Sequence, residues 1–438
     1  MPIRRSTDVA PALRTTGTTP AAAPKPAPKP VAAPPAEFTP TRGTALQTKL
    51  SQLRSMMAGH TDRKEEAQIL SMFREAPAGE LNQLIGGLSR DELHELTEDM
   101  DDRFFGPDNH TAFLQLMSTD RVGDLTVESK AKFFGALQGG TTDGKEEKAI
   151  GQMLLATKGD SLTALKNAID GGGDFHDLQQ LVFHDMDSPE LRASVLAHFK
   201  KEAPAKGERV KVHSDIDDTF YVNLKDKRYP GKTVYPGVRA LYQELDRGPG
   251  AQADRAGDLM FLSARPYDPA GLIEKGTRSM LADHGVTQAT VLSGDFAHVV
   301  GNSLIADKKY ENWQQINQLY PEYGSVFIGD SGQGDAIFGA KAAGANADMR
   351  GVFIHNVTGI DDAGKAEFAR KGVFVFDTYV GAATEAFKKG LISRDGLERV
   401  MSSASRELAG VHFDKPEQKA ARQAELDRDL AAAQAALA

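Results

Sequence analysis

The chain has 438 residues, a length that predicts more than one domain. Of these residues, 40% are hydrophobic and 26% are charged, as is usual for globular proteins. A net charge of −9 argues against a general nucleic-acid-binding protein, and the absence of cysteine excludes disulfides and cysteine nucleophiles. No apolar run approaches the roughly 20 residues that span a bilayer, and the first residues do not resemble a secretory signal. We therefore expect a cytoplasmic protein.

Residues 1–43 are predicted to be a disordered tether. Ten of the 21 prolines lie in the first 42 residues, in runs such as AAAPKPAPKPVAAPPA. Proline has no amide donor and a fixed φ, so a partly polyproline linker is expected. Its basic residues could meet an anionic surface, but a solvated linker explains the composition better.

Residues 44–203 are predicted to form an all-helical domain with an internal duplication. Apolar residues recur at helical spacing, as at Leu46, Leu50 and Leu53. The sequence HTDRKEE at 60–66 returns as TTDGKEE at 141–147. Apolar and acidic residues after this motif also match between the two copies. The matching pairs are Ile69 with Ile150, Met72 with Met153, Leu81 with Leu162, Leu84 with Leu165, and Met100-Asp101 with Met186-Asp187.

The repeated Thr-Asp, followed by an acidic first turn, indicates a helix N-cap in both copies. A faint resemblance of this opening to the calcium loops of annexin repeats is the less favoured alternative. Duplicated helical units bury each other's apolar faces, and such a domain could also hold a protein partner.

Residues 208–400 alternate short β-branched runs with helical stretches, which predicts an α/β fold with a doubly wound parallel sheet. The expected strands are Arg209–Ser214, Asp258–Ser263, Ala289–Leu292, Ser325–Ile328, Gly351–His355 and Gly372–Phe376. The expected helices are Gly237–Leu245, Pro269–His284, Tyr310–Leu319, Gly334–Ala343 and Ala363–Lys371. Residues 401–438 are expected to be a C-terminal helical tail.

Polar clusters follow the predicted strands, where ligands of parallel sheets bind. They are Asp215-Ile216-Asp217-Asp218-Thr219, Ser263-Ala264-Arg265-Pro266, Lys308-Lys309 and the stretch GDSGQGD from Gly329 to Asp335. Each cluster alone could be ordinary capping or loop chemistry. Their joint occurrence, in this order, predicts one site.

Hydrolysis of a phosphate ester explains these residue types. The reaction is very slow without catalysis, and a carboxylate nucleophile divides it into two easier steps. We predict Asp215 as the nucleophile and Asp217 as the general acid and base. Magnesium would offset the repulsion between carboxylate and phosphate. Its expected ligands are Asp215, Asp330, the backbone carbonyl of Asp217, and Asp335 either directly or as a supporting residue.

The remaining polar residues receive smaller roles. We expect Ser263 and Lys309, the latter in preference to Lys308, to hold the phosphoryl oxygens, with Thr219 steadying the phosphate-binding loop. Asp218 is predicted to be a solvated neighbour. His213 and His355 are expected to be strand residues with satisfied partners, and Trp313 a core residue.

These motifs resemble those of the haloacid dehalogenase superfamily, and more closely the catalytic domain of the actin-patch-associated phosphatidate phosphatases. The resemblance covers about residues 208–345, through SDIDDTFYVN, RYPGKTVYPGVRALYQEL, FLSARPYDP, DKKYENWQQINQLYP and VFIGDSGQGD. It implies a Rossmann-like fold and magnesium-dependent conversion of phosphatidate to diacylglycerol. The family's nucleophile, acid/base and metal carboxylate would fall on Asp215, Asp217 and Asp330.

The motif spacing leaves no room for a large cap domain, since 48 residues separate Asp215 from Ser263 and 46 separate Ser263 from Lys309. An uncapped site suits a membrane-held headgroup or a phosphorylated macromolecule. Phe220–Tyr235 is predicted to be a flap. Its basic residues, Lys225, Lys227, Arg228 and Lys232, could make peripheral contact with anionic lipid. An ordinary solvated hairpin is an equal alternative.

Two other functions remain open. One is a phosphatase for a soluble or protein-bound phosphoester. The other is a scaffold or effector whose repeats at 44–203 bind partners. For the scaffold, deletion of 44–203 is expected to spare turnover of a minimal substrate but to remove partner binding.

Overall fold

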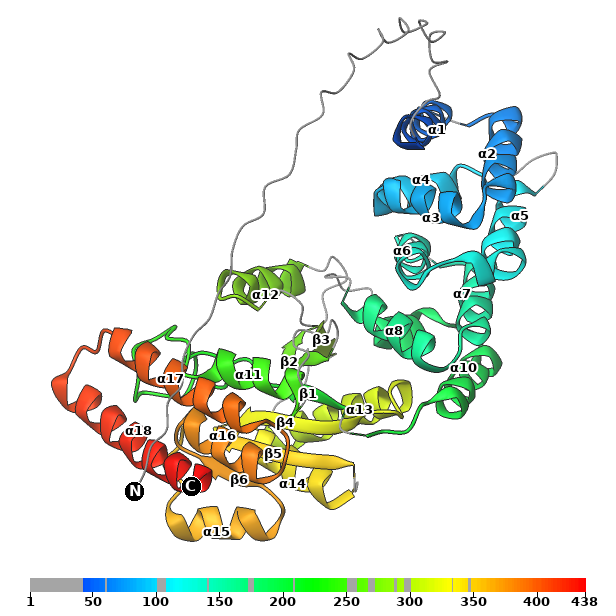
Figure 1. Cartoon of the computed structure of the whole chain (residues 1–438). Coiled ribbons are helices and arrows are strands. Elements are labelled where there is room, and N and C mark those ends of the chain that lie inside the picture. Colours follow the sequence, from blue (N-terminus) through cyan, green and yellow to red (C-terminus); the bar gives the residue numbers. More distant parts are fainter. Residues whose placement is uncertain are drawn as a thin grey trace, which may run out of the picture. The chain divides into compact units, whose positions relative to one another are not determined.

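The computed structural model describes residues 42–59, 61–100, 108–139, 142–171, 177–207, 209–249, 258–266, 272–286, 290–294, 301–332, 334–345 and 348–438 (Figure 1). The chain divides into two units, Met1–Ala45 and Leu46–Ala438. Nearly all of the predicted tether lies outside the described residues. The second unit contains the helical repeats and the sheet.

The N-terminal region is helical throughout its described residues, as predicted. Its helices are α1 (Arg42–Met56), α2 (Arg63–Glu75), α3 (Ala78–Gly87), α4 (Arg90–Glu98), α5 (Asn109–Gln115), α6 (Val127–Leu137), α7 (Gly144–Ala156), α8 (Gly159–Asp170), α9 (Leu178–Gln180) and α10 (Pro189–Glu202). Two π-helical turns, Leu116–Asp120 and Leu181–Asp185, extend α5 and α9, and a 3-10 turn covers Val122–Asp124.

The two copies of the sequence repeat begin with the same kind of helix cap. Asp62 caps α2 and Asp143 caps α7, each in a capping box completed by a glutamate three residues later. Both aspartates accept bonds from backbone amides of the first turn, which is the predicted capping chemistry. The matched residues Ile69, Leu81, Leu84, Ile150, Met153, Leu162 and Leu165 are all buried. His60, Asp101 and Thr141 lie outside the described residues.

The helices stack in two rows (Figure 1). One row consists of α2, α5, α7 and α10, each in contact with the next. In the other row, α3 and α4 contact α6, which contacts α8. Because each helix buries its apolar stripe against its neighbours, the region has one continuous core.

The C-terminal region contains a six-stranded parallel sheet of order β3-β2-β1-β4-β5-β6, which confirms the predicted α/β class. The strands are β1 (Val210–Ser214), β2 (Leu259–Pro266), β3 (Thr290–Gly294), β4 (Gly324–Asp330), β5 (Met349–His355) and β6 (Phe374–Phe376). All adjacent strands run parallel. β1 and β4 are buried over their whole length, as expected for a sheet covered on both faces.

Helices cover both faces of the sheet. They are α11 (Val238–Arg247), α12 (Leu272–Asp283), α13 (Asn302–Leu319), α14 (Asp335–Ala345), α15 (Asp362–Arg370), α16 (Tyr379–Lys388), α17 (Arg394–Gly410) and α18 (Pro416–Leu437). α13 and α14 pack on one face, and α11, α16 and α17 pack on the other. α13 begins eight residues before the predicted start, and α17 runs through the expected boundary at residue 400.

Buried polar contacts join α8 to the sheet region. Lys166 Nζ donates to the carbonyl of Leu319 (2.7 Å) and to the Glu322 carboxylate, and Thr163 donates to the same carboxylate (2.8 Å). Tyr320 donates to Asp170 at 2.5 Å. These contacts make the helical region and the sheet parts of one packed unit.

Within the described ranges, no helix combines the length and apolarity needed to cross a bilayer.

Candidate functional site

The predicted carboxylates meet where the order of the sheet reverses. β1 and β4 are neighbours, and their chains continue beyond the paired Ser214 and Ile328 into Asp215 and Asp330. The connection after β1 leads to β2 on one side, whereas β4 lies on the other. Such a switch point at the carboxyl ends of parallel strands is where α/β proteins bind ligands.

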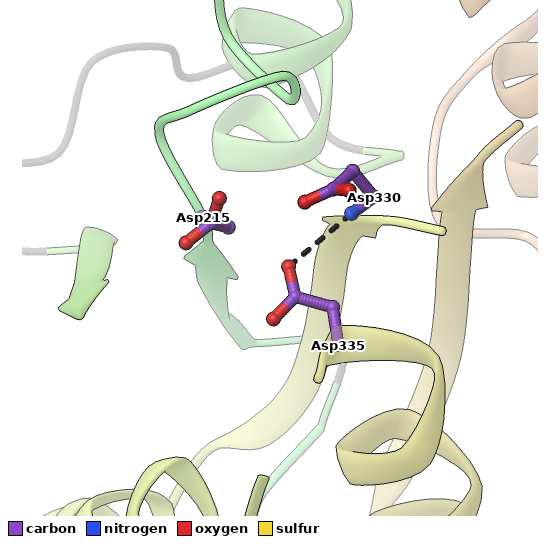
Figure 2. Close-up of side chains that lie close together, drawn as sticks. All are labelled: Asp215, Asp330 and Asp335. Carbon is purple, nitrogen blue, oxygen red and sulfur yellow. Dashed lines mark hydrogen bonds between the residues drawn. The ribbon is translucent and has the colours of Figure 1, made fainter. Parts of the chain in front are cut away.

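Asp215, Asp330 and Asp335 form a buried carboxylate cluster, with one oxygen of each within 4.8 Å of the others. Their side chains point toward one another from β1, β4 and the start of α14 (Figure 2). The amide of Asp330 donates to Asp335 Oδ2 (3.2 Å). A Cβ at Gly329 would lie 2.5 Å from that same oxygen, so this approach requires glycine.

Lys309, from α13, links the cluster. Its Nζ donates to Asp215 Oδ1 (2.7 Å) and to Asp335 Oδ1 (2.6 Å), and it is fully buried. Lys308 instead bonds Glu311 on the surface of the helix (3.3 Å). The fold therefore brings Lys309, and not Lys308, to the carboxylates.

The cluster carries more negative charge than its protein partners neutralise. Oδ2 of Asp215 and Oδ2 of Asp330 are buried and accept no hydrogen bond from the described residues. Burial raises the pKa of Asp215 to about 7, although Lys309 opposes the shift. Burial, with Asp335 and Asp215 nearby, raises the pKa of Asp330 well above its usual value. Burial opposes the charge of Lys309, but Asp215 and Asp335 outweigh it and raise its pKa.

Three carboxylates facing one ammonium leave a formal charge of −2, and two buried oxygens lack donors among the residues described. Oxygen ligands of this kind suit a divalent cation, above all a hard ion such as magnesium. The cluster can therefore hold a metal ion through Asp215, Asp330 and Asp335.

Adding Mg²⁺ to metal-free protein is expected to raise the melting temperature, and by more at about pH 8 than at about pH 5.5. A carboxyl group whose pKa rises on folding stabilises the folded protein. This stabilisation is complete below about pH 4 and is lost as the pH rises through the pKa of the folded state. For Asp215 that value is about 7. Mg²⁺ competes with this proton, so its stabilisation grows with pH.

Differential scanning fluorimetry of wild-type protein, Asp330→Asn and the control Asp307→Asn measures this effect. Asp307 lies on the surface of α13 and pairs with Lys341. Equal Mg²⁺ shifts in all three proteins would contradict a metal centre at the cluster.

Asp217 and Thr219 lie beside the cluster without joining it. Asp217 Oδ1 accepts bonds from Tyr221 Oη (3.0 Å) and Asn223 Nδ2 (2.8 Å). The buried carboxylate cluster of Asp215, Asp330 and Asp335 does not include the Asp217 carboxylate. Thr219 is buried, and its carbonyl accepts a bond from Tyr379 Oη. Its hydroxyl has no partner within the described part of the chain.

Ser263 lies in β2 with its backbone opposite Ser293 of β3. The described backbone thus places it on the strand next to β1. The predicted phosphate contact of its hydroxyl falls outside the described side chains.

The expectation for Asp218 was wrong. Asp218 is fully buried rather than solvated. His213 lies in β1, as predicted, but the partners expected for its two ring nitrogens are not found among the residues described. Burial, with Lys211 nearby, lowers the pKa of His213 to about 3. The local sequence predicts neither the burial of Asp218 nor the lack of partners at the His213 ring, because both depend on packing from distant segments.

His355 has the expected partners. Its Nδ1 donates to the carbonyl of Asp218 (3.3 Å), and Nε2 accepts from Arg228 (3.0 Å). Burial, then Arg228, lowers its pKa to about 3, so the ring is neutral at physiological pH. Trp313 is a core residue, as predicted.

Phe220–Tyr235 forms a hairpin-like loop after β1. Val222 and Thr233 pair through their backbones (2.9 Å), and the amide of Tyr235 donates to Phe220 (3.2 Å). Arg228 turns inward to Asp226 and His355. Arg228 is therefore engaged within the protein. Lys225, Lys227 and Lys232 are exposed, although Lys232 also donates to Asn223 Oδ1.

The fold and the cluster together define an α/β protein with a carboxylate-rich centre at the switch point of a parallel sheet. No protein-family model, curated protein or solved structure matches the chain. Its function therefore has to be inferred from the site.

Proposed function

We propose that the protein is a magnesium-dependent phosphomonoesterase of the haloacid dehalogenase type. The observation that carries the proposal is the buried cluster of Asp215, Asp330 and Asp335, bridged by Lys309 at the carboxyl ends of β1 and β4. A nucleophilic carboxylate, a fixed cation and further carboxylates for a metal are the groups that phosphoryl transfer needs.

In the proposed reaction, a carboxylate oxygen of Asp215 attacks phosphorus, and the bond from phosphorus to the leaving oxygen breaks. Asp217 donates a proton to that oxygen. Asp217 then removes a proton from water, which attacks the phosphorus of the aspartyl phosphate and restores Asp215. Lys309 holds Asp215 in place throughout. The metal held by the cluster would neutralise charge on the phosphoryl group.

A membrane-held phosphate ester, with phosphatidate as the leading candidate, is the proposed substrate. Among the described residues, the exposed large apolar side chains are Leu224, Leu304 and Ile337, each about half exposed. Leu224 lies in the loop after β1, and the other two lie in the first turns of α13 and α14. These elements all begin at the carboxyl edge of the sheet, around the cluster.

The exposed charges of the hairpin support the same substrate. Lys225, Lys227 and Lys232 are exposed, while the hairpin's acidic Asp226 is buried in a pair with Arg228. Each exposed lysine can add about 1 kcal/mol of attraction to an anionic membrane surface. Apolar side chains beside lysines are the pattern of a surface that contacts lipid headgroups.

Phosphate release from phosphatidate vesicles and from a soluble aryl phosphate, each with Mg²⁺, tests the proposal. We expect turnover of both, with vesicles preferred. The triple variant L224S/L304S/I337S is expected to lose about tenfold or more on vesicles and less than about twofold on the soluble ester, because only vesicles use the apolar surface.

Release from soluble esters alone would refute the lipid substrate and favour a phosphatase for a soluble or protein-bound ester. No release from any ester would refute the enzyme itself and favour the scaffold.

A further inference from the structure

The residue after Asp217 is Asp218, which has no role in the proposed reaction. It is fully buried, and its φ of +58° is in the left-handed region. Among residues with a side chain, aspartate and asparagine tolerate this conformation best. A buried carboxylate on such a backbone needs donors, and Asp218 has an unusual number of them.

The Asp218 carboxylate collects successive backbone amides of the loop after it. It accepts bonds from Asn223 (2.8 Å), Leu224 (3.0 and 3.1 Å) and Lys225 (2.5 Å), with a longer one from Asp226 (3.4 Å). A carboxylate has enough lone pairs for all of these amides, whereas neutral side chains do not.

The Asp218 backbone is fixed as well. Its amide donates to the carbonyl of Tyr221 (2.9 Å), and its carbonyl accepts from His355 Nδ1 (3.3 Å). The ring of His355 is in turn held by Arg228 and by stacking on Phe376. Asp218 is thus tied to β5 and β6 on one side and to the loop on the other.

The loop held by Asp218 carries two side chains that hold Asp217. Tyr221 Oη and Asn223 Nδ2 both donate to Asp217 Oδ1. Asn223 is held by both aspartates, because its backbone amide donates to Asp218 and its side chain donates to Asp217. The position of Asp217 therefore depends on a bond network centred on its neighbour.

We infer that Asp218 is a positioning residue that fixes the general acid Asp217 by anchoring the loop at 221–226. The inference rests on the proposed function for its kinetic consequence. The loop also lies against the metal centre, since a Cβ at Gly332 would meet Lys225 Cγ at 2.9 Å and Asp330 Oδ1 at 3.0 Å. Loss of the anchor is expected to loosen Asp217 first, because Tyr221 and Asn223 both belong to this loop.

The test compares leaving groups. An alkyl phosphate needs a proton on its leaving oxygen, whereas an aryl phosphate with an acidic phenol does not, so only the first depends on the general acid. Asp218→Asn keeps the size and the left-handed backbone but removes one acceptor oxygen. We expect kcat to fall about tenfold to a hundredfold on an alkyl phosphate and less than about threefold on an aryl phosphate, with KM nearly constant.

Two further variants make the comparison specific. Asp217→Asn should show the same selectivity with a larger loss. Asp177→Asn removes charge from another buried aspartate that accepts a backbone amide, at the start of α9, and should change turnover of neither substrate. Equal losses of Asp218→Asn on both esters would overturn the positioning role.

Hydrogen exchange separates this inference from the proposed function. The amides of Asn223, Leu224 and Lys225 should be protected in the wild type and exchange at least about tenfold faster in Asp218→Asn. Unchanged exchange would refute the anchor, even in a protein that releases no phosphate. If Asp218→Asn does not fold, the double variant Tyr221→Phe with Asn223→Ala is the alternative. It removes two side-chain bonds from the loop to Asp217 and should reproduce the leaving-group pattern.

Discussion

Asp215→Asn is expected to lower phosphate release by at least about 10⁴-fold while leaving the protein folded. The amide cannot form the acyl phosphate, so the reaction loses its covalent step. The fold should survive because Lys309 keeps its bond to Asp335, and because one of three buried carboxylates no longer repels the other two. Steady-state release and the melting temperature measure the two parts.

Acid quenching during turnover gives a stricter measurement. With a ³²P-labelled ester, label should appear on wild-type protein in hydroxylamine-sensitive form, as expected for an acyl phosphate. It should be absent from Asp215→Asn and present in the surface control Asp307→Asn. Label retained by Asp215→Asn would place the nucleophile elsewhere.

Lys166→Met is expected to lower the free energy of unfolding by about 3–5 kcal/mol, because it leaves the carboxylate of Glu322 buried without its cation. Glu322 is fully buried, and the hydroxyl of Thr163 would be its remaining hydrogen-bond donor among the described residues. The bond from Lys166 to the carbonyl of Leu319 is lost as well. Urea unfolding at neutral pH measures the change.

The double variant Lys166→Met with Glu322→Gln should recover part of the loss, because it removes the uncompensated charge. Lys200→Met, on the exposed side of α10, is the matched control and should change stability by less than about 0.5 kcal/mol. A Lys166→Met protein as stable as the control would show that the buried pair adds nothing.

The same contacts change the expectation for deletion of residues 44–203. The sequence alone suggests that these repeats are separable from turnover. In the structure, their removal would uncover Glu322, Tyr320 and Lys211, all of which are buried partners of α8. Point substitutions on the repeats, rather than their deletion, are therefore suited to testing whether they bind a partner.

Local patterns in the sequence are sufficient to predict the six strands, helices α11 to α15 and the edge of the sheet at which the site lies, whereas α16 was not predicted. Alternation of β-branched runs with helical stretches predicts all six strands, because periodicity and turn residues act locally. The duplicated caps at Asp62 and Asp143 are likewise readable, since a cap is made within one helical turn. The carboxylates of Asp215 and Asp330 can be assigned to one edge because parallel strands end together.

Which side chains meet depends on the tertiary structure. Lys309 reaches Asp215 across 94 residues, and its neighbour Lys308 does not, because the packing of α13 turns one toward the sheet and the other to the surface. Burial of Asp218 depends on β5 and on a loop that folds back over it. The buried ring of His213 and the pair of Lys166 with Glu322 arise in the same way, from contacts that strand order and helix packing create and that no local pattern records.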